Sequence, residues 1–128
     1  MFVNVSKKPY QSWSQNKLEA AKSFSDHIVN VCPPNNLYSM SDEDMEYSIH
    51  RITDGIVEKI DAFPNEPIDC ILVDINDKRM TYQLVWYLHE VFGVRILCPV
   101  YKCGRVVRIV NGKVYRGSQY EFIGFKDY

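Results

Sequence analysis

The chain lacks the glycine-rich loops that mark the common nucleotide-dependent enzymes. None of its six glycines stands in a G-x-x-x-x-G-K-[ST] or a G-x-G-x-x-G pattern, which argues against ATP hydrolysis and against a dinucleotide redox cofactor. The three histidines, His27, His50 and His89, belong to no Ser-His-Asp arrangement, so no histidine is an obvious general base.

A surplus of positive charge and a long apolar run are also missing. Fifteen Lys and Arg residues stand against sixteen Asp and Glu residues, for a net charge of -1. This balance argues against sequence-independent binding to long nucleic acid but leaves room for a small anionic ligand. No apolar run approaches the roughly 18 residues of a membrane helix, and the opening MFVNVSKKPY has no signal-peptide core. We therefore expect a cytoplasmic protein without a membrane partner.

The cysteines have no metal-binding pattern. Cys98 and Cys103 have four residues between them, without a second pair or a nearby histidine. Cys70 and Cys98 fall in apolar segments where cysteine packs as a small hydrophobe. Asp74 and Asp77 share one turn, where carboxylates more often cap the following helix than hold a metal. We expect reduced thiols, no metal and no cofactor.

Apolar segments and helix signals alternate along the chain. Ser12 and Gln15 fit a capping box for a helix that continues to about residue 24. Ser41 caps a long amphipathic helix that ends before Pro64, and a third helix over residues 80–92 has Gly93 as its C′ residue. Four strands are expected at residues 2–5, 27–31, 70–74 and 94–100, with a loop at Pro33-Pro34-Asn35-Asn36.

This alternation predicts an α/β domain over residues 1–128, with a Rossmann-like, mainly parallel sheet of strand order 2-1-3-4 flanked by helices. Residues 1–100 would form that core. Residues 101–128 would form a β-rich tail, with a hairpin around Asn111-Gly112 and a further short strand at residues 119–125.

In this sheet, the carboxyl ends of strands one, three and four share one edge. The loops expected there are residues 6–13, 74–81 and 99–105, and open α/β sheets bind ligands at such an edge. Taken singly, the basic residues of these loops are ordinary solvated charges. Taken together, they suit phosphate oxygens; they are Lys7, Lys8, Lys78, Arg79, Lys102 and Arg105.

Four short motifs resemble the small CRISPR-associated proteins of the CARF-like (Rossmann-type) group, some of which are ring nucleases. They are the opening MFVNVS, the WS before the first helix, TYQLV at residues 81–85, and the closing FIGFKDY. The resemblance implies a Rossmann-type fold, a homodimer and a cyclic oligoadenylate ligand, which some members cleave without metal. One departure is the turn at residues 74–80, which is longer and more charged than the turn expected in the family.

On this reading, Lys78, Arg79 and Ser6 hold phosphate and stabilise the developing charge while a ribose 2′-hydroxyl attacks the adjacent phosphorus. The expected ligand-binding residues are Trp13, Asn76, Thr81, Tyr101 and Lys102, with Trp13 or Tyr101 stacking on a base. Trp13 has a structural alternative, as an anchor of the first helix against the sheet. Two other functions stay open: a nucleotide-sensing or sequestering module without turnover, and a partner-binding structural subunit.

Overall fold

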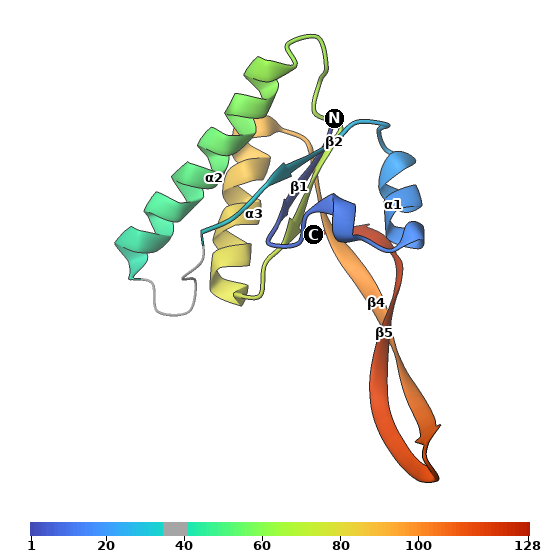
Figure 1. The fold of residues 1–128 in the computed structure, drawn as a ribbon. Coiled ribbons are helices and arrows are strands. Elements are labelled where there is room, and N and C mark those ends of the chain that lie inside the picture. The colour runs from blue at the N-terminus through green and yellow to red at the C-terminus, as the bar shows by residue number, and fades with distance from the viewer. Residues whose placement is uncertain (35–40) are drawn as a thin grey trace.

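The computed structural model describes residues 1–34 and 41–128, which form one mixed β-sheet with helices on both faces (Figure 1). The strand order is β2-β1-β3-β4-β5. The strands are β1 (Phe2–Ser6), β2 (Ile28–Val31), β3 (Cys70–Asp74), β4 (Arg95–Val110) and β5 (Lys113–Asp127). The first four run parallel, as the helical crossovers predicted, and β5 returns antiparallel to β4. Residues 35 and 36 of the predicted loop lie outside the described residues.

Alternate side chains of the central strands enter two separate hydrophobic clusters. Val3 and Val5 face the cluster formed with α2 (Asp42–Ala62) and α3 (Lys78–Phe92), whereas Phe2 faces the cluster formed with α1 (Gln15–Lys22). All five residues of β1 are buried because helices cover both sides of this strand. Burial of both faces explains why the parallel strands read as continuous apolar runs.

The helix ends follow their sequence signals, with two shifts. Ser41 and Asp44 complete a capping box on α2, and Gly93 ends α3 with a φ of 63°. Helix α3 begins at Lys78, two residues earlier than predicted, because the Asp77 side chain accepts a hydrogen bond from the backbone N–H of Met80. Helix α1 is capped by Ser14, after a 3₁₀ turn over Tyr10–Ser12.

Within the described ranges, no helix has the length and apolar character needed to cross a membrane.

The prediction of a loop at residues 99–105 was wrong, since β4 continues through it. Strand β4 pairs with β3 only from Arg95 to Leu97, and beyond Leu97 it has β5 alone as a neighbour. A strand with one free side tolerates a residue without an N–H, so Pro99 does not end β4. The predicted break before residue 119 is likewise absent, because β5 is one strand with a register shift opposite Val100 and Tyr101.

The distal part of this hairpin, residues 101–120, projects away from the sheet and helices, and we call it the arm (Figure 1). Its turn is the predicted pair Asn111-Gly112, with φ values of 53° and 75°. Two consecutive positive φ angles match a type I′ turn, whose twist suits a two-residue hairpin.

Tyr128 provides a test of how the end of the described chain is held. Its hydroxyl donates to the Val73 carbonyl oxygen at 2.7 Å, and burial raises the pKa of this phenol above its ordinary value of 10.0. We predict that Tyr128→Phe lowers the free energy of unfolding at pH 7 by about 1 kcal/mol through the lost hydrogen bond. The neutral phenol is favoured in the fold, so its contribution is present below pH 10 and is lost as pH rises through the raised pKa.

Urea unfolding of both proteins between about pH 9 and about pH 11 should therefore show the difference shrinking as pH rises. The buried Cys70 thiol, whose pKa is raised to about 12, is present in both proteins and cancels in the comparison. Tyr115→Phe, on the exposed part of the arm, is the matched control. A difference that stays constant or widens with pH would contradict the predicted role of Tyr128.

Candidate functional site

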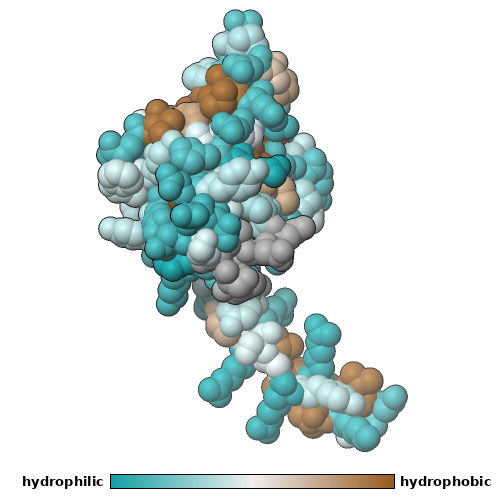
Figure 2. Space-filling view, turned by 90° about the vertical axis from the view of Figure 1, so that its left-hand side faces the viewer, coloured by the Kyte–Doolittle hydropathy of each residue, from teal (hydrophilic) through white to brown (hydrophobic). Residues whose placement is uncertain are grey.

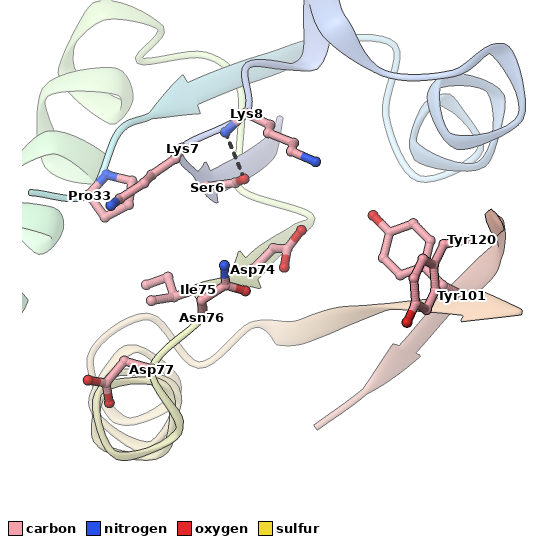
Figure 3. A pocket seen from close by; sticks show the side chains of 10 residues that line it. All are labelled: Ser6, Lys7, Lys8, Pro33, Asp74, Ile75, Asn76, Asp77, Tyr101 and Tyr120. Carbon is pink, nitrogen blue, oxygen red and sulfur yellow. Dashed lines mark hydrogen bonds between the residues drawn. The ribbon is translucent and has the colours of Figure 1, made fainter. Parts of the chain in front are cut away.

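A pocket of about 430 Å³ lies at the carboxyl edge of the sheet, where sequence reasoning placed the ligand. Figure 3 shows that its walls come from the segments after β1 and β3 and from the base of the arm. We call it the edge pocket. Its lining residues are Ser6, Lys7, Lys8, Pro33, Asp74, Ile75, Asn76, Asp77, Tyr101 and Tyr120.

The segment after β1 is held by buried polar groups. The Ser6 hydroxyl accepts a hydrogen bond from the backbone N–H of Lys8 at 3.0 Å. The Asn4 side-chain amide donates to the Lys8 carbonyl oxygen and to Asn30 Oδ1, both at 3.0 Å. In Figure 3 the Lys7 side chain runs toward Pro33, whereas Lys8 points to the opposite side, where the tyrosines lie. Ser6 therefore both lines the pocket and fixes the backbone that presents the two lysines.

The turn between β3 and α3 brings carboxylates to the same pocket. Asp77 lines the pocket while it caps α3, as expected for paired aspartates in a turn. The Thr81 hydroxyl donates to the Ile75 carbonyl oxygen at 3.2 Å, so Thr81 shapes the turn and is not a lining residue. Asn76 is an exposed lining residue, and Asp74 is half-buried at the end of β3.

The structure adds a residue that sequence reasoning missed, the buried Lys17 of α1. Only 4% of Lys17 is exposed, and its ammonium donates to the Tyr101 hydroxyl oxygen at 2.8 Å. The same nitrogen lies 3.8 Å from Asp74 Oδ2 and 4.7 Å from the centre of the Trp13 ring. A signal was available, because Lys17 precedes the buried Ala21 by four residues and so lies on the inward stripe of α1.

Burial and charge oppose each other at Lys17. Desolvation lowers the pKa of the ammonium below its ordinary value of 10.5, the nearby Asp74 carboxylate partly restores it, and Lys8 lowers it further. Burial also raises the pKa of the Tyr101 phenol, and Asp74 adds to that rise. Lysines with a depressed pKa beside a specific charged partner are frequent at functional sites.

A second hollow, of about 750 Å³, lies on the other side of Tyr101, between the start of α1 and the base of the arm. Lys8 and Tyr101 line both hollows, and Lys17, Lys102 and Arg105 line this one. Four of the six predicted basic residues, Lys7, Lys8, Lys102 and Arg105, are thus distributed over two adjacent hollows. We call the second one the arm-base pocket.

Lys78 and Arg79 line neither hollow. Both are exposed in the first turn of α3, and Arg79 Nη1 lies 3.6 Å from Asp42 Oδ1 at the start of α2. The early start of α3 puts these two residues on the helix, after the turn that forms the pocket wall. Their predicted contact with phosphate stays a prediction.

Trp13 packs as an anchor between the start of α1 and the sheet, which was the structural alternative to a base-stacking role. Its ring lies edge-on to Phe2 at 6.1 Å and tilted to Phe125 at 6.4 Å, and Lys17 lies over it. Tyr101 and Tyr120 are the pocket aromatics with more open rings, at 43% and 69% exposure. The tyrosines are thus better placed than Trp13 to stack on a planar ligand.

The edge pocket combines hydrogen-bond donors with two carboxylates. Lys7, Lys8 and Lys17 supply ammonium groups at or beside it, and Asp74 and Asp77 supply acceptors. Across residues 1–34 and 41–128, no three His, Cys, Asp or Glu side chains gather as a metal site would require. The pocket chemistry is that of an ammonium–carboxylate pair beside aromatic rings, which can bind phosphate and transfer protons.

Comparison with known proteins does not add an assignment. A scan of family models and searches of the curated proteins and of the solved structures found no match to this chain. The function of this chain is therefore inferred from the geometry of the two pockets and from the short motifs of the sequence.

Lys17→Met tests whether the buried lysine serves the fold. Because the depressed pKa means that the fold disfavours the charged ammonium, an apolar side chain of similar length should leave the free energy of unfolding at pH 7 unchanged or raise it by up to roughly 2 kcal/mol. The wild type should also gain stability as pH rises through the lowered pKa toward 10.5, and the variant should lack that gain.

Urea denaturation of both proteins across this pH range provides the measurement, with Lys22→Met at the exposed end of α1 as control. A clear loss of stability in Lys17→Met at pH 7 would show instead that its contacts with Tyr101 and Asp74 hold the structure together.

Proposed function

We propose that this protein binds a cyclic oligoadenylate and cleaves it without a metal ion, as a ring nuclease of the CARF-like, Rossmann-type group. The observation that carries this proposal is the buried Lys17 ammonium, held 2.8 Å from Tyr101 and 3.8 Å from Asp74 where the two pockets meet. The sequence motifs that resemble this family supply the ligand class.

The ligand-binding part of the proposal follows from the charges and rings of the two pockets. Lys7, Lys8 and Lys17 bind phosphate oxygens through charge-assisted hydrogen bonds, and the exposed rings of Tyr101 and Tyr120 stack on adenine. One pocket of about 430 Å³ is small for a ring of several nucleotides. A symmetric ligand is better served by two copies of the pocket across a two-fold axis, so we propose a homodimer.

The chemical step is an in-line attack by a ribose 2′-hydroxyl on the adjacent phosphorus. The 2′-oxygen forms a bond to phosphorus, and the bond from phosphorus to the 5′-oxygen breaks, which leaves a 2′,3′-cyclic phosphate and a free 5′-hydroxyl. Asp74 accepts the proton of the 2′-hydroxyl, and the Lys17 ammonium protonates the departing 5′-oxygen. A lysine with a lowered pKa is better suited to this donation than an ordinary one.

The experiment is incubation of the protein with cyclic tetra-adenylate and, separately, cyclic hexa-adenylate in the presence of EDTA, with products resolved by chromatography. We expect linear products with 2′,3′-cyclic phosphate ends. Lys17→Met should lower the single-turnover rate by about 100-fold, since general acid catalysis contributes roughly 10²–10⁴-fold. Lys22→Met, on the same helix but exposed, should match the wild type.

Binding without cleavage in the wild type would reduce the proposal to a nucleotide-sensing or sequestering module. Absence of binding to either ring would refute it. Wild-type rates in Lys17→Met would remove Lys17 from the chemistry, even if the wild type cleaves the ring.

The double variant Lys78→Ala/Arg79→Ala tests whether these two side chains hold phosphate, as the sequence predicts. If these two side chains hold phosphate, the variant should bind cyclic oligoadenylate roughly 2–4 kcal/mol more weakly at low salt, because charge-assisted hydrogen bonds contribute about 1.5–3 kcal/mol each before losses to solvent. Thermal stability should barely change, since both side chains are exposed. Unchanged affinity, measured by titration calorimetry, would show that these two side chains do not hold phosphate, and the site would then be sought around Lys7, Lys8 and Lys102.

A further inference from the structure

The arm is anchored at its base, where Tyr101 accepts a hydrogen bond from Lys17 of α1, and its far end extends away from the body. Two-stranded hairpins are marginally stable in water on their own, yet residues 101–120 project from the body (Figure 1). One face of the arm bears Val107, Ile109 and Val114, which are 63%, 74% and 58% exposed. The register pairs Ile109 with Val114, so these side chains form one apolar strip.

The arm is also strongly and uniformly charged. It contains no acidic residue and five basic ones, namely Lys102, Arg105, Arg108, Lys113 and Arg116. Because the whole chain has a net charge of -1, the remaining residues carry a compensating negative charge. Pairing of two arms with each other would bring like charges together and is disfavoured.

The complementary surface is the outer face of α2. This helix has seven acidic and two basic residues, and every one of the acidic residues is exposed. Helical spacing places five residues along one outer stripe, namely Glu43, Tyr47, Asp54, Glu58 and Asp61. Val57 beside this stripe is 40% exposed and Tyr47 is 63% exposed, with the Arg51 guanidinium 5.9 Å from the centre of the Tyr47 ring. The acidic surface therefore also offers apolar contacts. Figure 2 faces this side of the body, which is mostly hydrophilic, and shows hydrophobic and hydrophilic groups interleaved on the arm.

The arm and α2 of one copy cannot meet, because they lie on opposite sides of the body (Figure 1). Their lengths nevertheless match, since ten residues of a strand span about 34 Å and the 21 residues of α2 span about 32 Å.

We propose that the arm docks along the acidic outer face of α2 of a second copy, and that the reciprocal contact closes a two-fold dimer. The apolar strip of Val107, Ile109 and Val114 packs toward Tyr47 and Val57. Arg105 and Arg116, which the register places on the same face as the strip, lie among the α2 carboxylates. An RNA strand is the less suitable occupant, because the exposed aliphatic side chains of the arm have no counterpart on a phosphate backbone. This interface depends on charge and shape alone and is independent of any nucleotide chemistry.

The test uses the full chain without nucleotide and sedimentation velocity at micromolar concentration. The arm variant is Arg105→Glu/Arg116→Glu, whose side chains lie on the face of the apolar strip, and the helix variant is Asp54→Lys/Glu58→Lys. We expect a dimer for the wild type and a rise of about tenfold or more in the dimer dissociation constant for each variant, since like charges then meet across the interface. Lys22→Glu/Lys126→Glu, with the same change in net charge as the arm variant, should remain dimeric.

An equimolar mixture of the two variants distinguishes this contact from a general charge effect. In the mixed dimer, the acidic arm of one copy meets the basic helix of the other, and the second contact is wild type on both sides, so dimerisation should return. A monomeric wild type, a dimer insensitive to both variants, or a mixture that stays monomeric would each overturn the proposal. Binding of a labelled oligouridylate that the arm variant abolishes, with an unchanged sedimentation coefficient, would overturn it in favour of RNA.

Discussion

The parallel pairing of β1 with β3 is the constraint from which the rest of the site follows. Phe2 lies beside Cys70 and the register continues without a shift to Ser6 beside Asp74, so both strands end at the same level. The chain then turns away after each strand, and the two turns form adjacent walls of the edge pocket. Strand β1 lies between the α1 cluster and the cluster of α2 and α3. A slip of one residue in the pairing would therefore move each β1 side chain from one cluster to the other.

The buried Lys17 lowers the stability that burial could otherwise provide at the carboxyl edge of the sheet, because its ammonium is desolvated. Helix α1 covers one face of the sheet mainly through Leu18, Ala21 and the aromatic cluster around Phe2, and an apolar side chain at position 17 would extend that cover. The chain instead holds a desolvated ammonium between Tyr101 and Asp74. A buried cation is weak support for stability, so its position between two pockets is more readily explained by what it contacts there than by packing.

The strands, and the sheet edge at which the pocket lies, could be predicted from sequence because their signals are local. Apolar runs bounded by polar turns located β1 to β3, and Ser41, Gly93 and Asn111-Gly112 marked ends and turns through their own backbone preferences. The errors arose where a distant partner decides. Pro99 was assigned to a loop because its pairing partner β5 is distant in sequence. Lys78 and Arg79 were assigned to the turn, whereas Asp77 caps α3 before them. Lys17 was not singled out, because its partner Tyr101 lies 84 positions away.

The net charge of -1 conceals a strong separation of charge in space. All charges of the arm are positive, whereas α2 on the opposite side of the body is predominantly acidic. Solubility alone does not require such separation, because interspersed charges of both signs keep a small domain in solution. In the proposed dimer, separation along two matched lengths creates a directional attraction between copies, which steers their encounter and weakens as salt screens it. The same positive field at the base of the arm lies beside Lys8 and Lys17, so an anion approaching the two pockets meets the arm cations first.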